Sequence, residues 1–183
     1  MEPGLARYLE LLRAYGRVLD LSSPRVLEDP GALVEAVRAY AEVLPPGATV
    51  LDLGSGGGWP GLPLALLRPD LTLHLVERRR KRAAFLELAR GRLGLANVRV
   101  LPGDVRELKG PYRYVVAQAV APLPELFRLV QPVAGFPLVL ASVRGPGWRE
   151  EAAALAERAP AEVFHVKPLA RGGTLVAVRV EEA

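Results

Sequence analysis

A cluster of glycines beside a carboxylate is the part of this 183-residue chain best suited to bind a ligand. In the segment "VLDLGSGGGWPGLPL", Gly54, Ser55, Gly56 and Gly58 directly follow an apolar stretch. Glycine accepts positive φ angles and lets a ligand approach the backbone closely. Asp52 lies two residues before Gly54, where its carboxylate can orient the loop or meet a cationic ligand. We therefore expect these five residues to line one wall of a ligand site.

A second carboxylate ends the next apolar stretch. "LTLHLVE" finishes at Glu77, about 25 residues after Asp52. In nucleoside-binding α/β folds, an acidic side chain at this position takes the ribose hydroxyls. A tight glycine turn followed by a surface glutamate is the structural alternative. The combination of the loop and Glu77 favours a nucleoside cofactor.

The glycine spacing alone leaves the identity of that cofactor open, because Gly56–Gly61 also fits the dinucleotide pattern. Asp52 and Asp104 favour S-adenosylmethionine. Asp104, followed by Val105 in "LPGDV", ends the third predicted strand, where it can meet an adenine amino group. A helix cap or turn is the alternative role for Asp104. A nicotinamide-dependent oxidoreductase rests on the glycine spacing only, since no Tyr-x-x-x-Lys or comparable catalytic pair accompanies it.

A basic run follows Glu77 at once. The sequence "ERRRKR" places Arg78, Arg79, Arg80, Lys81 and Arg82 together, in a chain whose formal net charge is only +4. Such a cluster can attract phosphates and makes these residues candidates for RNA binding. A solvated helix face is the alternative interpretation.

The composition excludes several other kinds of site. There are no cysteines, so disulfides and thiolate metal sites are excluded, and with only two histidines no metal site is expected. No apolar run approaches the roughly 20 residues that span a bilayer, and the first 20 residues lack the apolar block of a signal peptide. We expect a cytoplasmic protein without membrane contact, and a monomer.

The elements that would position these residues alternate in type along the chain. Predicted strands cover 49–53, 71–77, 98–104, 112–119 and 136–144, and predicted helices cover 61–67, 79–94, 123–133 and 147–159. Two closing strands, at 162–169 and 173–182, are expected to be antiparallel. The alternation predicts an α/β fold with a mostly parallel sheet, in which ligands bind beyond the carboxyl ends of the strands. Helices at 3–19 and 30–44 predict an amino-terminal extension, residues 1–46, packed on a domain of residues 47–183.

Four motifs give the chain a family resemblance: "LDLGSGGGWPGLPLAL" (51–66), "KRAAFLELARGRLGLANVRVLPG" (81–103), "AVAPLPEL" (119–126) and "VRGPG" (143–147). With them the chain resembles the bacterial glucose-inhibited division protein B family, over roughly residues 8–180. These are S-adenosylmethionine-dependent methyltransferases that act on guanine N7 of small-subunit (16S) ribosomal RNA. The resemblance implies a Rossmann-like class I methyltransferase fold with a seven-stranded sheet, S-adenosylmethionine as cofactor, and ribosomal RNA or the small ribosomal subunit as partner.

The chain departs from the family pattern mainly on the substrate side. Gln118 stands where the family usually has arginine, and Arg144 stands where it usually has lysine. The family's amino-terminal "NLT" is Asp-Leu-Ser at 20–22. These changes motivate a second hypothesis, a non-catalytic module of the same fold that binds RNA or the ribosome.

Guanine N7 carries a lone pair in the neutral base, so its methylation needs no general base, only in-line placement. Gln118 and Arg144 are our candidates for the catalytic side of the site. Gln118 can hydrogen-bond a base edge, with a polar strand-end residue as the alternative. Arg144 can hold a phosphate or cap its strand. Trp59 can stack on a base or serve as an apolar lid.

Overall fold

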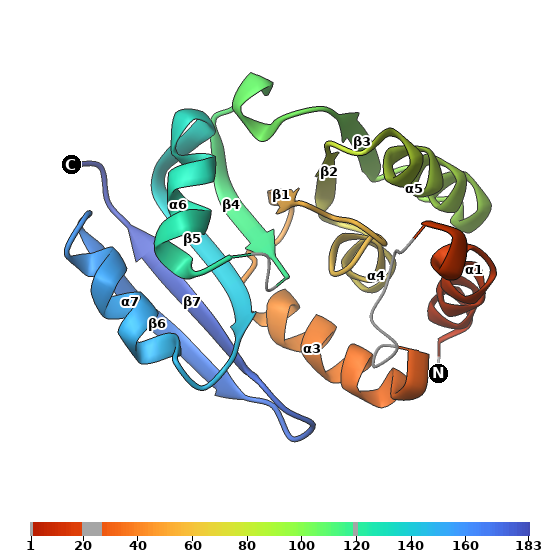
Figure 1. Ribbon diagram of the computed structural model, residues 1–183, viewed down its shortest axis with the longest axis horizontal. Helices are drawn as coiled ribbons and strands as arrows, with labels where there is room; N and C mark the ends of the chain where they lie inside the picture. Colours follow the sequence, from red (N-terminus) through yellow and green to blue (C-terminus); the bar gives the residue numbers. More distant parts are fainter. Residues whose placement is uncertain (1, 20–26, 119–120) are drawn as a thin grey trace.

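The computed structural model describes residues 2–19, 27–118 and 121–183 (Figure 1). Its centre is a seven-stranded sheet in the order β3-β2-β1-β4-β5-β7-β6. The strands are β1 (Thr49–Leu53), β2 (Thr72–Glu77), β3 (Val98–Pro102), β4 (Tyr112–Ala117), β5 (Ala134–Arg144), β6 (Ala161–Pro168) and β7 (Thr174–Val180). The predicted Asp-Leu-Ser segment at 20–22 and the motif residues Ala119 and Val120 lie outside the described residues.

The first five strands run parallel, and β7 pairs antiparallel with both β5 and β6. The mostly parallel sheet with antiparallel closing strands is therefore confirmed. Strand ends differ slightly from the expected ones: β5, for example, begins at Ala134 and not at Phe136. The chain leaves β1 toward β2 and β3 on one side, then returns to place β4 and β5 on the other. This reversal is the position at which open α/β sheets bind ligands.

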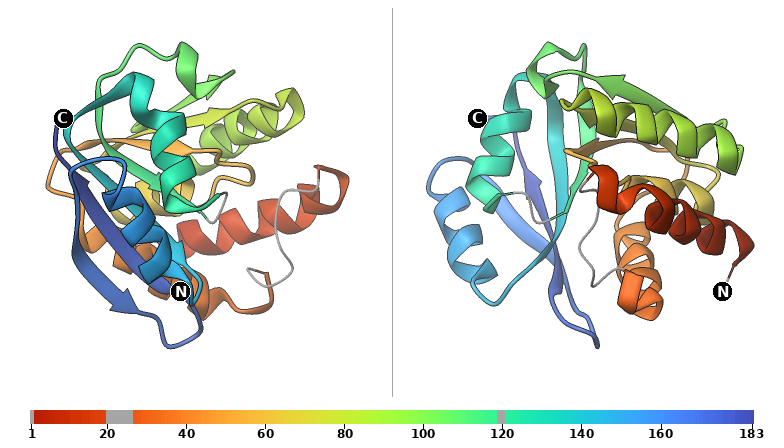
Figure 2. Two further views of the ribbon diagram at one scale, coloured as in Figure 1. Left: turned by 60° about the vertical axis from the view of Figure 1, so that its left-hand side comes forward. Right: turned by 45° about the vertical axis from the view of Figure 1, so that its right-hand side comes forward.

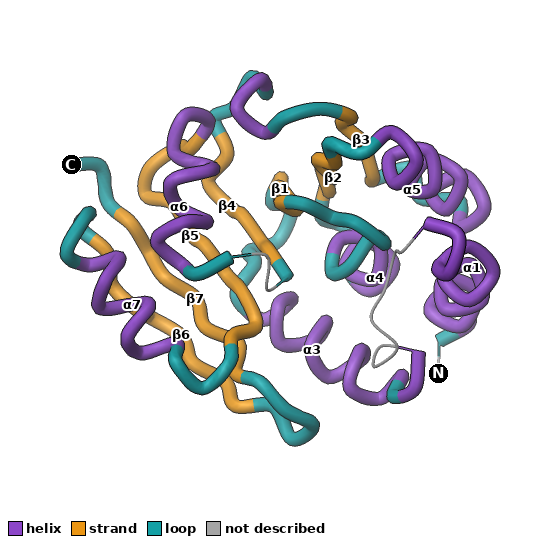
Figure 3. Tube along the Cα trace, in the orientation of Figure 1, coloured by secondary structure: helices purple, strands orange, loops and turns teal. Residues whose placement is uncertain are grey.

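Helices cover both faces of the sheet, as Figure 2 shows from two sides. One face carries α1 (Pro3–Leu19), α3 (Pro30–Glu42), α4 (Gly61–Leu67) and α5 (Arg80–Leu93). The other face carries α6 (Leu123–Val130) and α7 (Trp148–Ala156), with short 3₁₀ turns η1 (Val105–Glu107) and η2 (Gln131–Val133). Figure 3 shows the loops that join these helices to the strand ends. None of the described helices has the length and apolarity needed to cross a membrane.

Local chemistry explains several helix ends. The carboxylate of Asp29 accepts a hydrogen bond from the N–H of Ala32 and so caps α3. Gly94 ends α5 in the left-handed conformation, with a φ of 65°, as its position in the sequence predicted.

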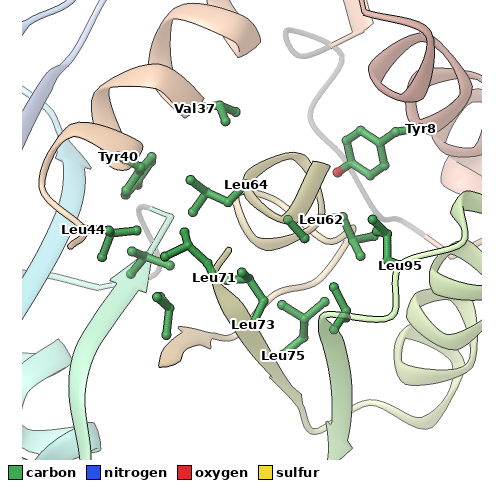
Figure 4. Close-up of a cluster of buried hydrophobic side chains, with 14 of the residues drawn as sticks. Tyr8, Val37, Tyr40, Leu44, Leu62, Leu64, Leu71, Leu73, Leu75 and Leu95 are labelled. Carbon is green, nitrogen blue, oxygen red and sulfur yellow. The ribbon is translucent and has the colours of Figure 1, made fainter. Parts of the chain in front are cut away.

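The core on the α4 face includes residues from the amino-terminal helices. Leucines of α4 and β2 pack there beside Tyr8 of α1 and Tyr40 of α3, and both tyrosines are 0% exposed (Figure 4). α1 and α3 thus complete one hydrophobic layer of the sheet. The division of the chain into an extension (1–46) and a domain (47–183) stays a prediction.

Candidate functional site

The glycine loop follows β1 and adopts backbone conformations that favour glycine. The φ angles of Gly54, Gly56 and Gly58 are 70°, 53° and 90°. The N–H of Gly58 donates to the carbonyl oxygen of Ser55 at 2.7 Å, which closes the turn. A Cβ on Gly58 would lie 2.4 Å from a methyl carbon of Leu62. The loop is therefore compact as well as left-handed, and a side chain at Gly58 would not fit.

Asp52 lies beneath this loop and is fully buried. Its Oδ2 accepts a hydrogen bond of 2.8 Å from the N–H of Gly61, the first residue of α4, whereas its Oδ1 has no partner among the described residues. Burial raises the pKa of Asp52 to about 8, and the nearby charge of Glu77 adds to this effect. The carboxylate of Asp52 therefore holds the start of α4, and its predicted roles toward the loop and toward a cationic ligand stay predictions.

Glu77 joins the glycine loop to the end of β2. Its Oε2 accepts a hydrogen bond from the N–H of Gly56 at 2.9 Å, and its Oε1 accepts one from the N–H of Arg79 at 3.0 Å. With Gly54, Arg78 and Arg79 it lines a pocket of about 430 Å³. A carboxylate offers about four acceptor positions, so Glu77 retains capacity for further donors.

The third strand ends at Pro102 and not at Asp104 as expected, so Asp104 lies two residues beyond β3. It still lies near the end of β2, because the N–H of Gly103 donates to the carbonyl of Glu77 at 2.9 Å. Asp104 caps η1 by accepting from the N–H of Arg106, and it also forms an ion pair of 2.7 Å with the Arg106 guanidinium. These contacts hold the pKa of Asp104 well below its usual range. Val105 is buried in the core on the α6 face. The geometry therefore displays the cap, while the adenine contact of Asp104 and Val105 stays a prediction.

The basic run surrounds the start of α5. Arg78, Arg79, Arg80 and Lys81 are exposed, and Arg82 is half-buried. Arg78 and Arg79 line the same pocket as Glu77. The first turn of α5 contains no acidic residue, so these cations face the positive end of the helix dipole, where they do not stabilise the helix. This placement weighs against a purely structural role for the run.

A second pocket, of about 360 Å³, opens at the ends of β4 and β5. Trp59, Gln118 and Arg144 line it, together with residues of α3 and of the turn between β6 and β7. The structure thus brings the two predicted catalytic-side residues to one cavity. Trp59 comes from the glycine loop segment, and its ring packs edge-on against Tyr40, with a centroid distance of 6.4 Å.

Each of these three side chains has one buried polar atom without a partner among the described residues: Nε1 of Trp59, Oε1 of Gln118 and Nε of Arg144. Buried polar groups in native proteins are almost always hydrogen-bonded, so each exception needs an explanation. Two of the atoms are donors and one is an acceptor. Because the three residues that carry these atoms line the same cavity, the cavity is the candidate site for a polar ligand.

The rest of the Arg144 guanidinium is engaged by the protein. It donates to Oγ of Ser142 at 3.2 Å and to Oε1 of Glu151, on α7, at 2.8 Å. The same Glu151 oxygen accepts from the N–H of Leu123 at the start of α6. Arg144, whose side chain is 7% exposed, is thus held in place by α7 and β5 at the pocket wall.

Our sequence analysis missed the two tyrosines that contact this site. Tyr8 donates a hydrogen bond to the carbonyl of Gly57, and Tyr40 bonds the backbone at the ends of β4 and β5. The available signal was a tyrosine at a buried helix position, because a buried hydroxyl usually requires a partner.

The two histidines lie in separate polar contacts. Nδ1 of His74 is 2.7 Å from the hydroxyl of Tyr112, and His165 lies beside Glu42. Across residues 2–19, 27–118 and 121–183, no group of three or more potential metal ligands comes together.

Comparison with known proteins decides the family. Residues 1–170 match the model of a family described as GidB, rRNA small subunit methyltransferase G. The chain belongs to the GidB family. A relative from Thermobifida fusca, named ribosomal RNA small subunit methyltransferase G, is 40% identical over 82% of this chain and 66% of its own length. One of the same name from Kineococcus radiotolerans is 38% identical over 96% of this chain and 73% of its own length. The predicted family is confirmed.

Solved structures place this GidB-family chain among methyltransferase folds. A SAM-dependent methyltransferase from Aquifex aeolicus matches with a TM-score of 0.63 and 19% identity, over 91% of this chain and 98% of its own. A mutant of MtNAS, in complex with S-adenosylmethionine, matches with a TM-score of 0.70 and 16% identity, over 98% of this chain and 75% of its own. At these identities the likeness concerns the fold, and the predicted Rossmann-like fold is confirmed.

Proposed function

We propose that this chain transfers a methyl group from S-adenosylmethionine to RNA, with guanine N7 of small-subunit (16S) ribosomal RNA as the acceptor. Membership of the GidB family supports the reaction and the class of substrate. The observation that carries the assignment to residues is the second pocket, because three of its lining side chains, those of Trp59, Gln118 and Arg144, each hold a buried polar atom without a partner among the described residues.

The residues around the glycine loop fit a nucleoside cofactor. Gly54, with a φ of 70°, lines the pocket without a side chain, and Glu77 at the pocket wall still has acceptor capacity that ribose hydroxyls can use. Asp52 holds the start of α4, and we assign the adenine contact to Asp104 and Val105. When bound, S-adenosylmethionine supplies an electrophilic methyl group. The protein residues bind and orient the two reactants.

The second pocket fits the Watson–Crick edge of guanine. Trp59 and Arg144 each offer one donor, which suits the O6 acceptor of guanine, and Gln118 offers an acceptor, which suits the ring N–H or the exocyclic amino group. These contacts with the Watson–Crick edge do not involve N7. The N7 lone pair therefore stays available, and catalysis reduces to placement and exclusion of water.

The exposed run from Arg78 to Lys81 adjoins the cofactor pocket. Because these cations do not stabilise α5, we assign them to the phosphates of the RNA. An acceptor in 16S RNA or the assembled small subunit would place the protein in the cytoplasm. The monomeric state stays a prediction.

The proposal is tested with radiolabelled S-adenosylmethionine and small ribosomal subunits from a bacterial strain that lacks the corresponding methyltransferase. We expect label in 16S RNA, and 7-methylguanosine in its nucleoside digest by mass spectrometry. Free 16S RNA serves as a second substrate form. Tight binding to subunits with no transfer to either form would contradict the proposal and support the non-catalytic alternative.

A further inference from the structure

Two fully buried tyrosines connect the amino-terminal helices to the two halves of the site. Tyr8 belongs to α1 and Tyr40 to α3, and both side chains are 0% exposed. Figure 4 shows them on opposite sides of α4, among the leucines of the core. Their rings contribute to packing, but their hydroxyls contact backbone atoms far away in the sequence. The question is what these hydroxyls position.

The Tyr40 hydroxyl bridges two neighbouring strands. It donates to the carbonyl oxygen of Ala117 at 2.8 Å and accepts from the N–H of Val143 at 3.0 Å. The pairing of β4 with β5 ends at Ala117 and Ser142. The hydroxyl therefore joins the two strands immediately after their last paired residues, where the backbone groups would otherwise separate without partners.

The residues next to this bridge are those of the second pocket. Gln118 directly follows Ala117, and Arg144 directly follows Val143. The Tyr40 ring also packs edge-on against Trp59, at an interplanar angle of 88°. Tyr40 thus contacts Trp59 and hydrogen-bonds the residues that directly precede Gln118 and Arg144. Burial raises the pKa of Tyr40, so the hydroxyl keeps the proton that it donates.

The Tyr8 hydroxyl makes the corresponding contact on the cofactor side. It donates to the carbonyl oxygen of Gly57 at 2.8 Å, in the middle of the glycine loop. Gly57 lies between Gly56, whose N–H donates to Glu77, and Gly58, whose N–H closes the turn. Tyr8 and Glu77 therefore hold neighbouring residues of the same loop.

We infer that Tyr8 and Tyr40 are positioning residues, Tyr8 for the cofactor loop and Tyr40 for the base pocket. On this account α1 and α3 set the two halves of the site separately, each through one hydroxyl. The inference rests on the proposed function, because it assigns the two halves to cofactor and RNA. The loss of one buried hydrogen bond is enough to change binding by about tenfold.

The test compares Tyr8→Phe, Tyr40→Phe and the control Tyr15→Phe. Tyr15 lies on α1 and packs against Phe85, but no hydrogen bond of its hydroxyl is found among the described residues. Affinity for S-adenosylhomocysteine is measured by calorimetry. KM and kcat are measured with small ribosomal subunits, whose affinity is also measured directly. Melting temperatures report the general effect on packing.

We expect each of the two variants to lose affinity for a different ligand. Tyr8→Phe should weaken S-adenosylhomocysteine about tenfold and leave the affinity for subunits unchanged. Tyr40→Phe should weaken the binding of subunits about tenfold and leave the affinity for S-adenosylhomocysteine unchanged. We also expect a raised KM or a lowered kcat for subunits. Tyr15→Phe should match the parent protein. Equal losses of both affinities in both variants, or no difference from Tyr15→Phe, would overturn the inference. A purely structural role would weaken both affinities together and would not separate the two variants.

Amide hydrogen exchange of the unmodified protein tests the bridge without any variant. The N–H of Val143 should be protected as well as the paired amides of β5, and rapid exchange there would overturn the bridge. A parent protein that binds subunits and S-adenosylhomocysteine but transfers no methyl group would defeat the proposed function alone. The positioning roles of Tyr8 and Tyr40 would then still be tested by the affinities of the variants for S-adenosylhomocysteine and for subunits.

Discussion

The two halves of the candidate site differ in how their polar groups are satisfied. On the cofactor side, both oxygens of Glu77 accept backbone N–H groups and Oδ2 of Asp52 holds the start of α4, whereas Oδ1 of Asp52 has no partner among the described residues. On the substrate side, Trp59, Gln118 and Arg144 each keep one buried polar atom without a partner in the described part of the chain.

This difference indicates which half the protein completes by itself. The cofactor half is pre-organised by its own backbone, so binding there requires little rearrangement. In the substrate half, unpaired buried groups cost roughly 1–3 kcal/mol each, and a correctly placed base would recover that free energy. Discrimination between bases should therefore come from the second pocket, since an ill-fitting base leaves those groups unpaired.

The largest expected effect concerns Asp52 and pH. Because burial raises its pKa from 3.8 to about 8, the folded chain binds one more proton than the unfolded chain between these values. Its contribution should make stability fall as pH rises through this window, by up to about 1.4 kcal/mol per pH unit. Asp52→Asn keeps an acceptor for Gly61 and should remove this slope. Urea unfolding at pH 5 and pH 8 measures the change in the free energy of unfolding for the parent and the variant. The same change in both proteins would contradict a raised pKa of Asp52.

Removal of the Glu77 carboxylate should lower the affinity for the cofactor without changing the affinity for subunits. Glu77→Ala leaves the N–H groups of Gly56 and Arg79 without their acceptor and deletes the expected ribose contact. We expect S-adenosylhomocysteine to bind about 30- to 150-fold more weakly, roughly 2–3 kcal/mol, with subunit affinity unchanged. Calorimetry measures this against Glu162→Ala, a change at an exposed position of β6. An unchanged affinity in Glu77→Ala would remove the ribose role.

Rigidity of the loop can be tested at Gly58. Gly58→Ala places a Cβ 2.4 Å from Leu62 at a φ of 90°, so it should destabilise the fold by about 1–3 kcal/mol. The matched control is Gly91→Ala in α5, where a Cβ meets nothing within 4 Å and helix propensity should add up to about 1 kcal/mol of stability. Denaturant unfolding compares them, and equal stabilities would show that the loop is not constrained as described.

A substitution of Gln118 in the second pocket should have different effects on stability and on function. Gln118→Leu replaces a buried oxygen that has no partner among the described residues by an apolar group, so stability should stay constant or rise slightly. The kcat/KM for subunits should nevertheless fall by about tenfold, with S-adenosylhomocysteine affinity unchanged. A variant with undiminished kcat/KM would show that Gln118 does not contact the base.

The cofactor half could be predicted from sequence because its parts are local. Asp52 and the glycines occupy seven consecutive positions, and Glu77 ends the next strand. Asp104 shows the limit of such reasoning: Arg106, two residues away, pairs with the carboxylate that the strand-end position assigned to adenine. A neighbour in sequence competes for the same oxygens as a ligand, and the position alone does not decide between them.

The substrate half could not be assembled from sequence, because its partners are distant. Glu151 of α7 fixes Arg144, and Tyr40 meets Val143 across 103 positions of the chain. Only the fold brings these groups together. The sequence identified Gln118 and Arg144 as candidates but contained no signal for the contacts with Ser142 and Glu151 that leave Nε of Arg144 without a partner among the described residues.

A crystal structure of the protein with S-adenosylhomocysteine tests the division of the site most directly. The account predicts ribose hydroxyls within hydrogen-bonding distance of Glu77, the glycine loop unmoved, and the second pocket left open for a base. Nucleoside bound in the pocket of Trp59, Gln118 and Arg144, with no contact to Glu77, would contradict it.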